Sequence, residues 1–118
     1  MSVRAPSSVK QIRSWHSDNG RWLATLSLKP PQLAQRAGLE FRRETDDLGS
    51  YAVAFVRLSS GPDFMLRCDD HPNIAGTMVW APTEVSATKT QLRSLLAALN
   101  VRADEVAEVS PELKLRQT

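Results

Sequence analysis

The residues best suited to chemistry lie in two short acidic stretches of this 118-residue sequence. The first stretch contains Asp46 and Asp47, and the second contains Cys68, Asp69, Asp70 and His71. If antiparallel strands connect the two stretches, both lie at the same end of a sheet. Clustered carboxylates bind hard cations, and zinc accepts Cys, His and Asp ligands. No second Cys or His stands at a ligand spacing, so we predict a solvated or partner-binding acidic surface and no metal site.

The same stretches lack the pattern of a catalytic site. Nucleophilic catalysis requires Cys68 or a serine beside a positioned base, and the sequence contains only two histidines, His16 and His71. Alternation along a strand directs the side chains of Cys68 and His71 to opposite faces. The sequence has no glycine-rich phosphate loop, no Gly-x-Ser-x-Gly motif and no His-Glu-x-x-His motif. We therefore predict a protein that is not an enzyme and uses no cofactor.

Basic and aromatic residues near the N-terminus support an alternative function. Residues 1–43 contain eight Arg and Lys side chains against two acidic ones, whereas residues 44–75 contain two against six. Arg13, Trp15, Arg21 and Trp22 alternate around a predicted turn, and such a mixture of charge and rings binds single-stranded nucleic acid. The basic residues are spread singly, however, which is more typical of a solvated surface. Nucleic-acid binding is therefore the second interpretation.

Three short β-prone runs in residues 50–82 must position the acidic stretches. Residues 51–58 and 64–68 flank the turn residues 59–63 and predict a hairpin. Pairing Leu58 with Phe64 places one apolar set on a single face, namely Ala52, Ala54, Val56, Leu58, Phe64, Leu66 and Cys68. The opposite face then receives Tyr51, Arg57, Arg67 and Asp69. We expect the apolar face to be the core face, and residues 77–81 to form a further strand.

The N-terminal segments predict a second hairpin and a short helix. Asn19-Gly20 separates residues 10–16 from residues 21–28, and Asn-Gly between apolar runs is a strong hairpin signal. A helix over residues 21–28 is the competing interpretation. Residues 30–38 have prolines at the start and a glycine at the end, as a short helix does. Residues 39–43 alternate and predict a strand, followed by a turn over residues 45–49.

The clearest helix lies near the C-terminus. Thr88 and Gln91 have the spacing of a capping box, and four leucines follow at helical spacing, namely Leu92, Leu95, Leu96 and Leu99. Asn100 suits the left-handed conformation in which many helices end. Residues 103–109 could form either a helical turn or a short strand.

Together these elements predict a small α+β domain. Its antiparallel sheet has about 4–6 short strands, drawn mainly from residues 39–81, and one face is covered by the C-terminal amphipathic helix plus one short helix. Residues 1–8 are predicted to be a flexible leader, residues 9–113 the single domain and residues 114–118 a frayed tail. No apolar run approaches the roughly 20 residues that span a bilayer, so we expect no membrane partner.

The predicted function is that of a small bacterial-type protein-binding domain, such as an inhibitor, immunity or adaptor protein. Its expected binding residues are Asp46, Asp47, Asp69, Asp70 and His71, which would recognise another protein through charge. We expect a cytoplasmic location, because a single Cys and no apolar leader agree with a reducing compartment. A homodimer through an edge strand within residues 9–28 is a further possibility.

Overall fold

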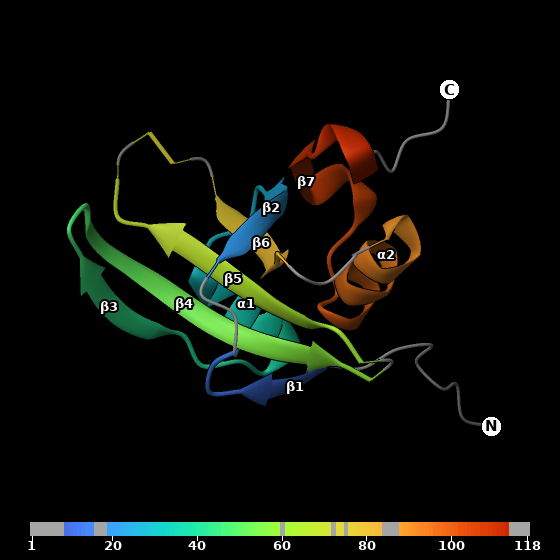
Figure 1. Cartoon of the computed structure of the whole chain (residues 1–118), viewed down its shortest axis with the longest axis horizontal. Helices are drawn as coiled ribbons and strands as arrows, with labels where there is room; N and C mark the ends of the chain where they lie inside the picture. Colours follow the sequence, from blue (N-terminus) through green and yellow to red (C-terminus); the bar gives the residue numbers. More distant parts are fainter. Residues whose placement is uncertain are drawn as a thin grey trace.

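Alternating apolar and polar residues organise the described part of the chain into one seven-stranded antiparallel sheet with two helices (Figure 1). The computed structural model describes residues 9–15, 19–59, 61–71, 73–74, 76–83 and 88–113, except for the side chain of Glu112. The strands are β1 (Val9–Ile12), β2 (Gly20–Leu26), β3 (Arg42–Asp46), β4 (Gly49–Leu58), β5 (Asp63–Asp69), β6 (Thr77–Pro82) and β7 (Val106–Val109). The helices are α1 (Pro30–Ala37) and α2 (Lys89–Ala98), and 3-10 turns span Ala103–Glu105 and Pro111–Leu113.

The sheet is larger than the predicted one, and the expected fold class is therefore wrong. Its order is β1-β4-β5-β6-β2-β7, and β3 pairs with the part of β4 that β1 leaves open. The fold is mostly sheet, instead of 4–6 strands covered by a C-terminal helix. Strands from both ends of the chain join the sheet, and β7 is too short, at four residues, to show a recognisable period in the sequence. The predicted leader and tail lie outside the described residues.

The central hairpin confirms the predicted faces but corrects the predicted register. Val56 lies opposite Phe64, and Ala54 lies opposite Leu66, so Leu58 does not pair with Phe64. The observed pairing register differs from the predicted one by two residues, and a shift of two residues leaves every side chain on the same face of the sheet. Val56, Phe64 and Leu66 are fully buried, as expected. Val53 lies on the opposite face and is also buried, so that face is partly covered as well.

The predicted N-terminal hairpin is wrong. β1 pairs with β4, whereas β2 pairs with β6 on one side and β7 on the other. β2 lies inside the sheet because Leu23, Ala24 and Leu26 are fully buried, and an edge position beside β1 alone would leave them exposed. A bulge at Leu23 allows two successive side chains of β2 to be buried. The predicted helix over residues 21–28 is excluded as well.

The segment between α1 and β4 is also shifted from the prediction. The strand begins at Arg42 and runs to Asp46, so Leu39 and Phe41 precede it instead of alternating within it. Leu39 is buried, because Leu39 and Phe41 pack on the core as the chain leaves α1. The turn shrinks to Asp47-Leu48, and β4 starts at Gly49.

Two short helices form at the predicted segments, and their buried side chains pack into one core with the strands. α1 ends at Gly38, whose φ of 68° is left-handed, and α2 is capped by Thr88, whose hydroxyl accepts from the Gln91 amide at 3.1 Å. Asn100 is left-handed, with a φ of 61°. In Figure 1, α1 lies behind β4 and β5. Buried side chains of both helices join one core with the strands, including Leu33, Leu92, Leu95, Phe64 and Val79. Among the described residues, no helix has the length and apolar character needed to cross a membrane.

Candidate functional site: the acidic end of the sheet

The two acidic stretches meet at one end of the sheet, as predicted. The β3–β4 turn brings Asp46 opposite Gly49, and the exit of β5 brings Asp69 opposite Tyr51. The Asp70 amide donates to the Ser50 carbonyl oxygen at 3.0 Å, which extends this pairing. We call this surface the acidic end, and it consists of Asp46, Asp47, Leu48, Asp69, Asp70 and His71. A hollow of about 330 Å³ lies within it, lined by all of these residues except Asp47.

Two arginines that the sequence reasoning missed bind the carboxylates of the acidic end. The Arg67 guanidinium donates to Asp69 at 2.8 Å and to Asp46 at 3.1 Å, and it lies 3.7 Å from the centre of the Tyr51 ring. Arg43 pairs with Asp70. The spacing of Arg67 and Asp69 could have revealed their contact, because residues i and i+2 share a strand face. Four carboxylates against two guanidinium groups leave the acidic end negative by two charges.

A tight turn at the acidic end exposes Leu48. The Leu48 amide donates to Asp46 Oδ1 at 2.9 Å, and this bond, followed by the contact with Arg67, lowers the pKa of Asp46 below its usual range. Asp46 therefore remains a carboxylate and stabilises the two-residue turn. The Leu48 side chain is 93% exposed, and among the described residues no other large hydrophobic side chain is exposed. Sequence reasoning missed Leu48 because it treated the turn as polar.

The Cys68 and His71 side chains do not form a nucleophile and its base. Cys68 is buried, and burial raises the pKa of its thiol, whereas a nucleophile requires a lowered pKa. The His71 Nδ1 accepts a hydrogen bond from the Asn73 amide at 3.1 Å. Within the described residues, no group of three or more His, Cys, Asp and Glu side chains is arranged to hold a metal ion. The remaining histidine, His16, lies outside the described residues.

The residues of the alternative site lie in and around the sheet face opposite the helices. Trp22 pairs with Trp80, and Trp80 pairs with Met65, which places these three side chains in one row. Trp15 packs edge-on against Phe55, with ring centres 5.5 Å apart. Arg21 lies next to Trp22 in β2 and is half-buried, and Arg13 is exposed after β1. The Trp22 Nε1 donates to the Thr25 hydroxyl at 3.0 Å. The tryptophans are thus partly buried against the sheet.

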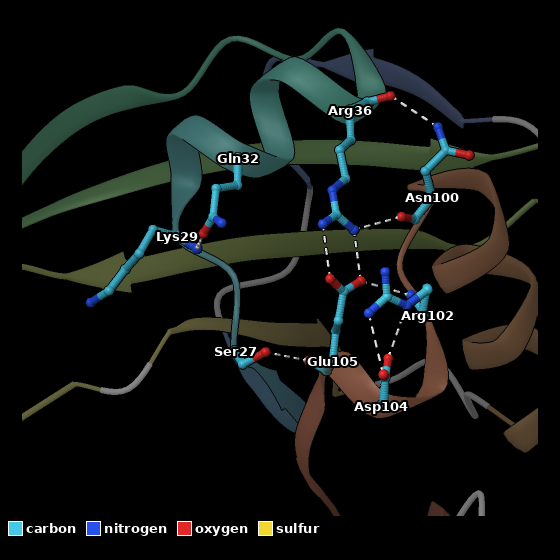
Figure 2. Close-up of polar contacts among 8 residues, drawn as sticks. All are labelled: Ser27, Lys29, Gln32, Arg36, Asn100, Arg102, Asp104 and Glu105. Carbon is cyan, nitrogen blue, oxygen red and sulfur yellow. Dashed lines mark hydrogen bonds and ion pairs between the residues drawn. The ribbon is translucent and has the colours of Figure 1, made fainter.

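The most strongly perturbed acid belongs to a structural network on the helix side of the sheet (Figure 2). Two nitrogens of Arg36 donate to Glu105 at 2.6 and 2.8 Å, and the Arg102 amide donates to it at 3.0 Å. These bonds lower the pKa of Glu105 to about 2. The Arg36 guanidinium also donates to the backbone carbonyl oxygen of Asn100. The side-chain amide of Asn100 in turn donates to the backbone carbonyl oxygen of Arg36. The network therefore ties α1 to the segment that enters β7.

Comparisons with known proteins leave the geometry as the basis for a functional proposal. A scan against protein-family models found no match, and searches of curated proteins and of solved structures found no significant similarity.

Proposed function

We propose that this protein acts by binding another protein, as an inhibitor, immunity or adaptor protein does, and that the partner docks on the acidic end. The observation that supports this most directly is the 93% exposed Leu48, which follows Asp46 and Asp47 at the tip of a hairpin. Protein-binding surfaces commonly have an apolar centre and a polar rim, and Leu48 with the carboxylates beside it offers that arrangement. The hollow beside it gives the partner a second point of contact.

The charge of the acidic end specifies the kind of partner. Two excess negative charges attract a basic surface, and charge complementarity accelerates association and excludes acidic competitors. Arg43 and Arg67 hold the carboxylates of Asp69 and Asp70 in place, so those groups are ordered before the partner arrives. The partner would then provide an apolar pocket for Leu48, surrounded by Lys or Arg.

Two variants test the two components of this surface. The partner is first captured from a lysate on the immobilised protein, identified by mass spectrometry and titrated in pure form. Removing most of the Leu48 side chain in Leu48→Ala should weaken binding about tenfold to a hundredfold, because burial of a leucine contributes about 1.5–3 kcal/mol. Replacing the four carboxylates Asp46, Asp47, Asp69 and Asp70 by Asn should reduce the association rate most strongly at low salt.

A matched variant separates local from overall charge. Amide replacement of Glu40, Asp63, Asp104 and Glu108 changes the net charge by the same amount at positions away from the acidic end. This variant should bind the partner about as well as the original protein, and circular dichroism should confirm that all variants fold. If Leu48→Ala and the four-Asn variant bind as tightly as the matched variant, the acidic end is not the docking surface.

A second candidate function is nucleic-acid binding by the sheet face opposite the helices. One observation favours it: Trp15, Trp22, Phe55 and Trp80 lie on that face, and the Arg42 guanidinium lies 5.9 Å from the centre of the Phe55 ring. Rings and arginines on one surface are typical of single-strand binders. Titration with single-stranded DNA and RNA at two salt concentrations tests this candidate. Tight, salt-sensitive binding that Trp15→Ala abolishes would support it, and absence of binding would eliminate it.

A further inference from the structure

A second cleft lies next to the acidic end, between the start of α1 and the sheet. Its volume is about 470 Å³, which is within the usual range of small-molecule sites. We propose that this cleft binds a small organic monocarboxylate, with the carboxylate at Lys29 and the apolar body on the sheet. The proposal does not rest on the proposed function, because its principal residues, Lys29, Ala34 and Phe41, lie outside the acidic end.

The inner wall of the cleft is apolar. β4 and β5 provide Ala52 and Cys68, both buried, and α1 provides Ala34 and its two prolines. Phe41 closes one side, where the chain runs from α1 to β3. The Cys68 thiol stays protonated because burial raises its pKa, so it adds an uncharged, polarizable surface. A hydrocarbon chain or ring is therefore the part of a ligand that suits this wall.

Lys29 provides a positive charge that the surrounding residues do not neutralise. Its ammonium donates to the Ile74 carbonyl oxygen at 3.0 Å, and among the described residues no carboxylate lies within ion-pair distance of it. An ammonium has three donors, and among the described residues the Ile74 carbonyl accepts only one of them. Figure 2 shows the Lys29 side chain extending away from the Arg36–Glu105 pair, so it does not belong to that network. The free donors at the rim of an apolar cleft suit an anionic head group.

The other charges at the rim limit the ligand to a single negative charge. Asp69 and Asp70 also line the cleft, but Arg67 binds Asp69 and Arg43 binds Asp70. These pairs offset part of the charge of Asp69 and Asp70, and Lys29 has no carboxylate partner among the described residues. The nearby carboxylates still repel a dianion such as a phosphate monoester. A carboxylate carries one charge and can accept two hydrogen bonds from the ammonium, so it matches the rim best.

Three probes of equal size test the proposal. 4-Phenylbutyrate, 4-phenylbutanamide and 4-phenylbutylamine share an apolar body and differ in the charge of the head group. Titration calorimetry should show the acid binding about tenfold or more tighter than the amide, because a hydrogen bond to a charged group contributes more than a neutral one. In Lys29→Gln this preference should vanish while amide binding persists. Lys10→Gln, which changes an exposed lysine of β1, should keep the preference.

A variant that fills the cleft tests the apolar wall separately from the head group. Ala34→Leu should fill the cleft from the α1 side, weaken binding of all three probes and leave the circular dichroism spectrum unchanged. The proposal is wrong if the acid binds no tighter than the amide, if the amine binds tightest, or if Lys29→Gln keeps the preference for the acid. None of these results depends on partner binding at Leu48.

Discussion

Replacing Gly76 by alanine tests a close backbone contact that no sequence pattern reveals. Gly76 precedes β6 and is buried against the end of β2. A Cβ atom at this position would overlap the Leu26 carbonyl oxygen and would lie 2.9 Å from the Leu26 carbonyl carbon and 3.1 Å from that of Ser27. All three atoms belong to the backbone, so no side-chain rotation relieves the overlap. The start of β6 would have to move away from β2.

The contacts at this point indicate how much the movement costs. The Thr77 amide and hydroxyl both donate to the Leu28 carbonyl oxygen, at 3.0 and 2.9 Å, and Thr77 is fully buried. Separating the strands would leave these groups unsatisfied, at about 1–3 kcal/mol for each buried donor. We therefore expect Gly76→Ala to lower the free energy of unfolding by about 2–6 kcal/mol. That is a large part of the roughly 5–15 kcal/mol that stabilises a domain.

Urea denaturation followed by tryptophan fluorescence measures this loss, and Gly38→Ala provides the control. A Cβ at Gly38 meets no atom within 4 Å, but its φ of 68° is unfavourable for alanine. We expect Gly38→Ala to cost only about 1–2 kcal/mol, and Gly38→Asn to cost less than that, since asparagine adopts the left-handed conformation more readily. If Gly76→Ala costs no more than Gly38→Ala, the close approach of β6 to β2 is incorrect.

Two further predictions concern the helices and the network that holds them. Glu105→Gln should lower the free energy of unfolding near pH 7, and the difference from the original protein should shrink as the pH falls from about 5 towards 2. The pKa of Glu105 is about 2 in the native state and 4.5 ordinarily. The stabilisation by this carboxylate is therefore complete above pH 4.5 and is lost on acidification. Urea denaturation across this pH range measures the deficit, and a constant deficit would refute the role of the Arg36 contact. Leu95→Ala should cost about 2–5 kcal/mol because Leu95 is fully buried, whereas Leu48→Ala should cost almost nothing. Thermal unfolding measures both variants, and an equal loss of stability in Leu95→Ala and Leu48→Ala would contradict the burial of Leu95 in the core.

Local patterns predicted those features that depend on nearby residues. The alternation around Val56 and Leu66 identified the core face, because side chains of a strand point to opposite faces at every step. Thr88 and Gln91 identified the start of α2, and Gly38 the end of α1, because caps depend on residues within one turn. The meeting of the two acidic stretches was also predictable, because consecutive antiparallel strands bring the β3–β4 turn and the end of β5 to the same end of the sheet.

The candidate site could be predicted only in part. Asp46, Asp69 and Asp70 lie together as expected, but their pairing with Arg43 and Arg67 was not expected. Opposite charges attract at any separation in sequence, so composition alone does not show which arginine reaches which carboxylate. The exposure of Leu48 likewise depends on the turn geometry and not on its residue type.

The sequence by itself determined which side chains share a face in the central hairpin and where the helices begin and end, because these properties follow from strand alternation and from helix caps. Only the tertiary structure decided that β2 pairs with β6 and β7 rather than with β1, and that Gly76 must lie against Leu26. Asn19-Gly20 favoured a hairpin by local turn preference, yet burial of Leu23 and Leu26 within the sheet outweighs that preference. Partner choice among strands depends on the total apolar area buried, which is a property of the whole chain.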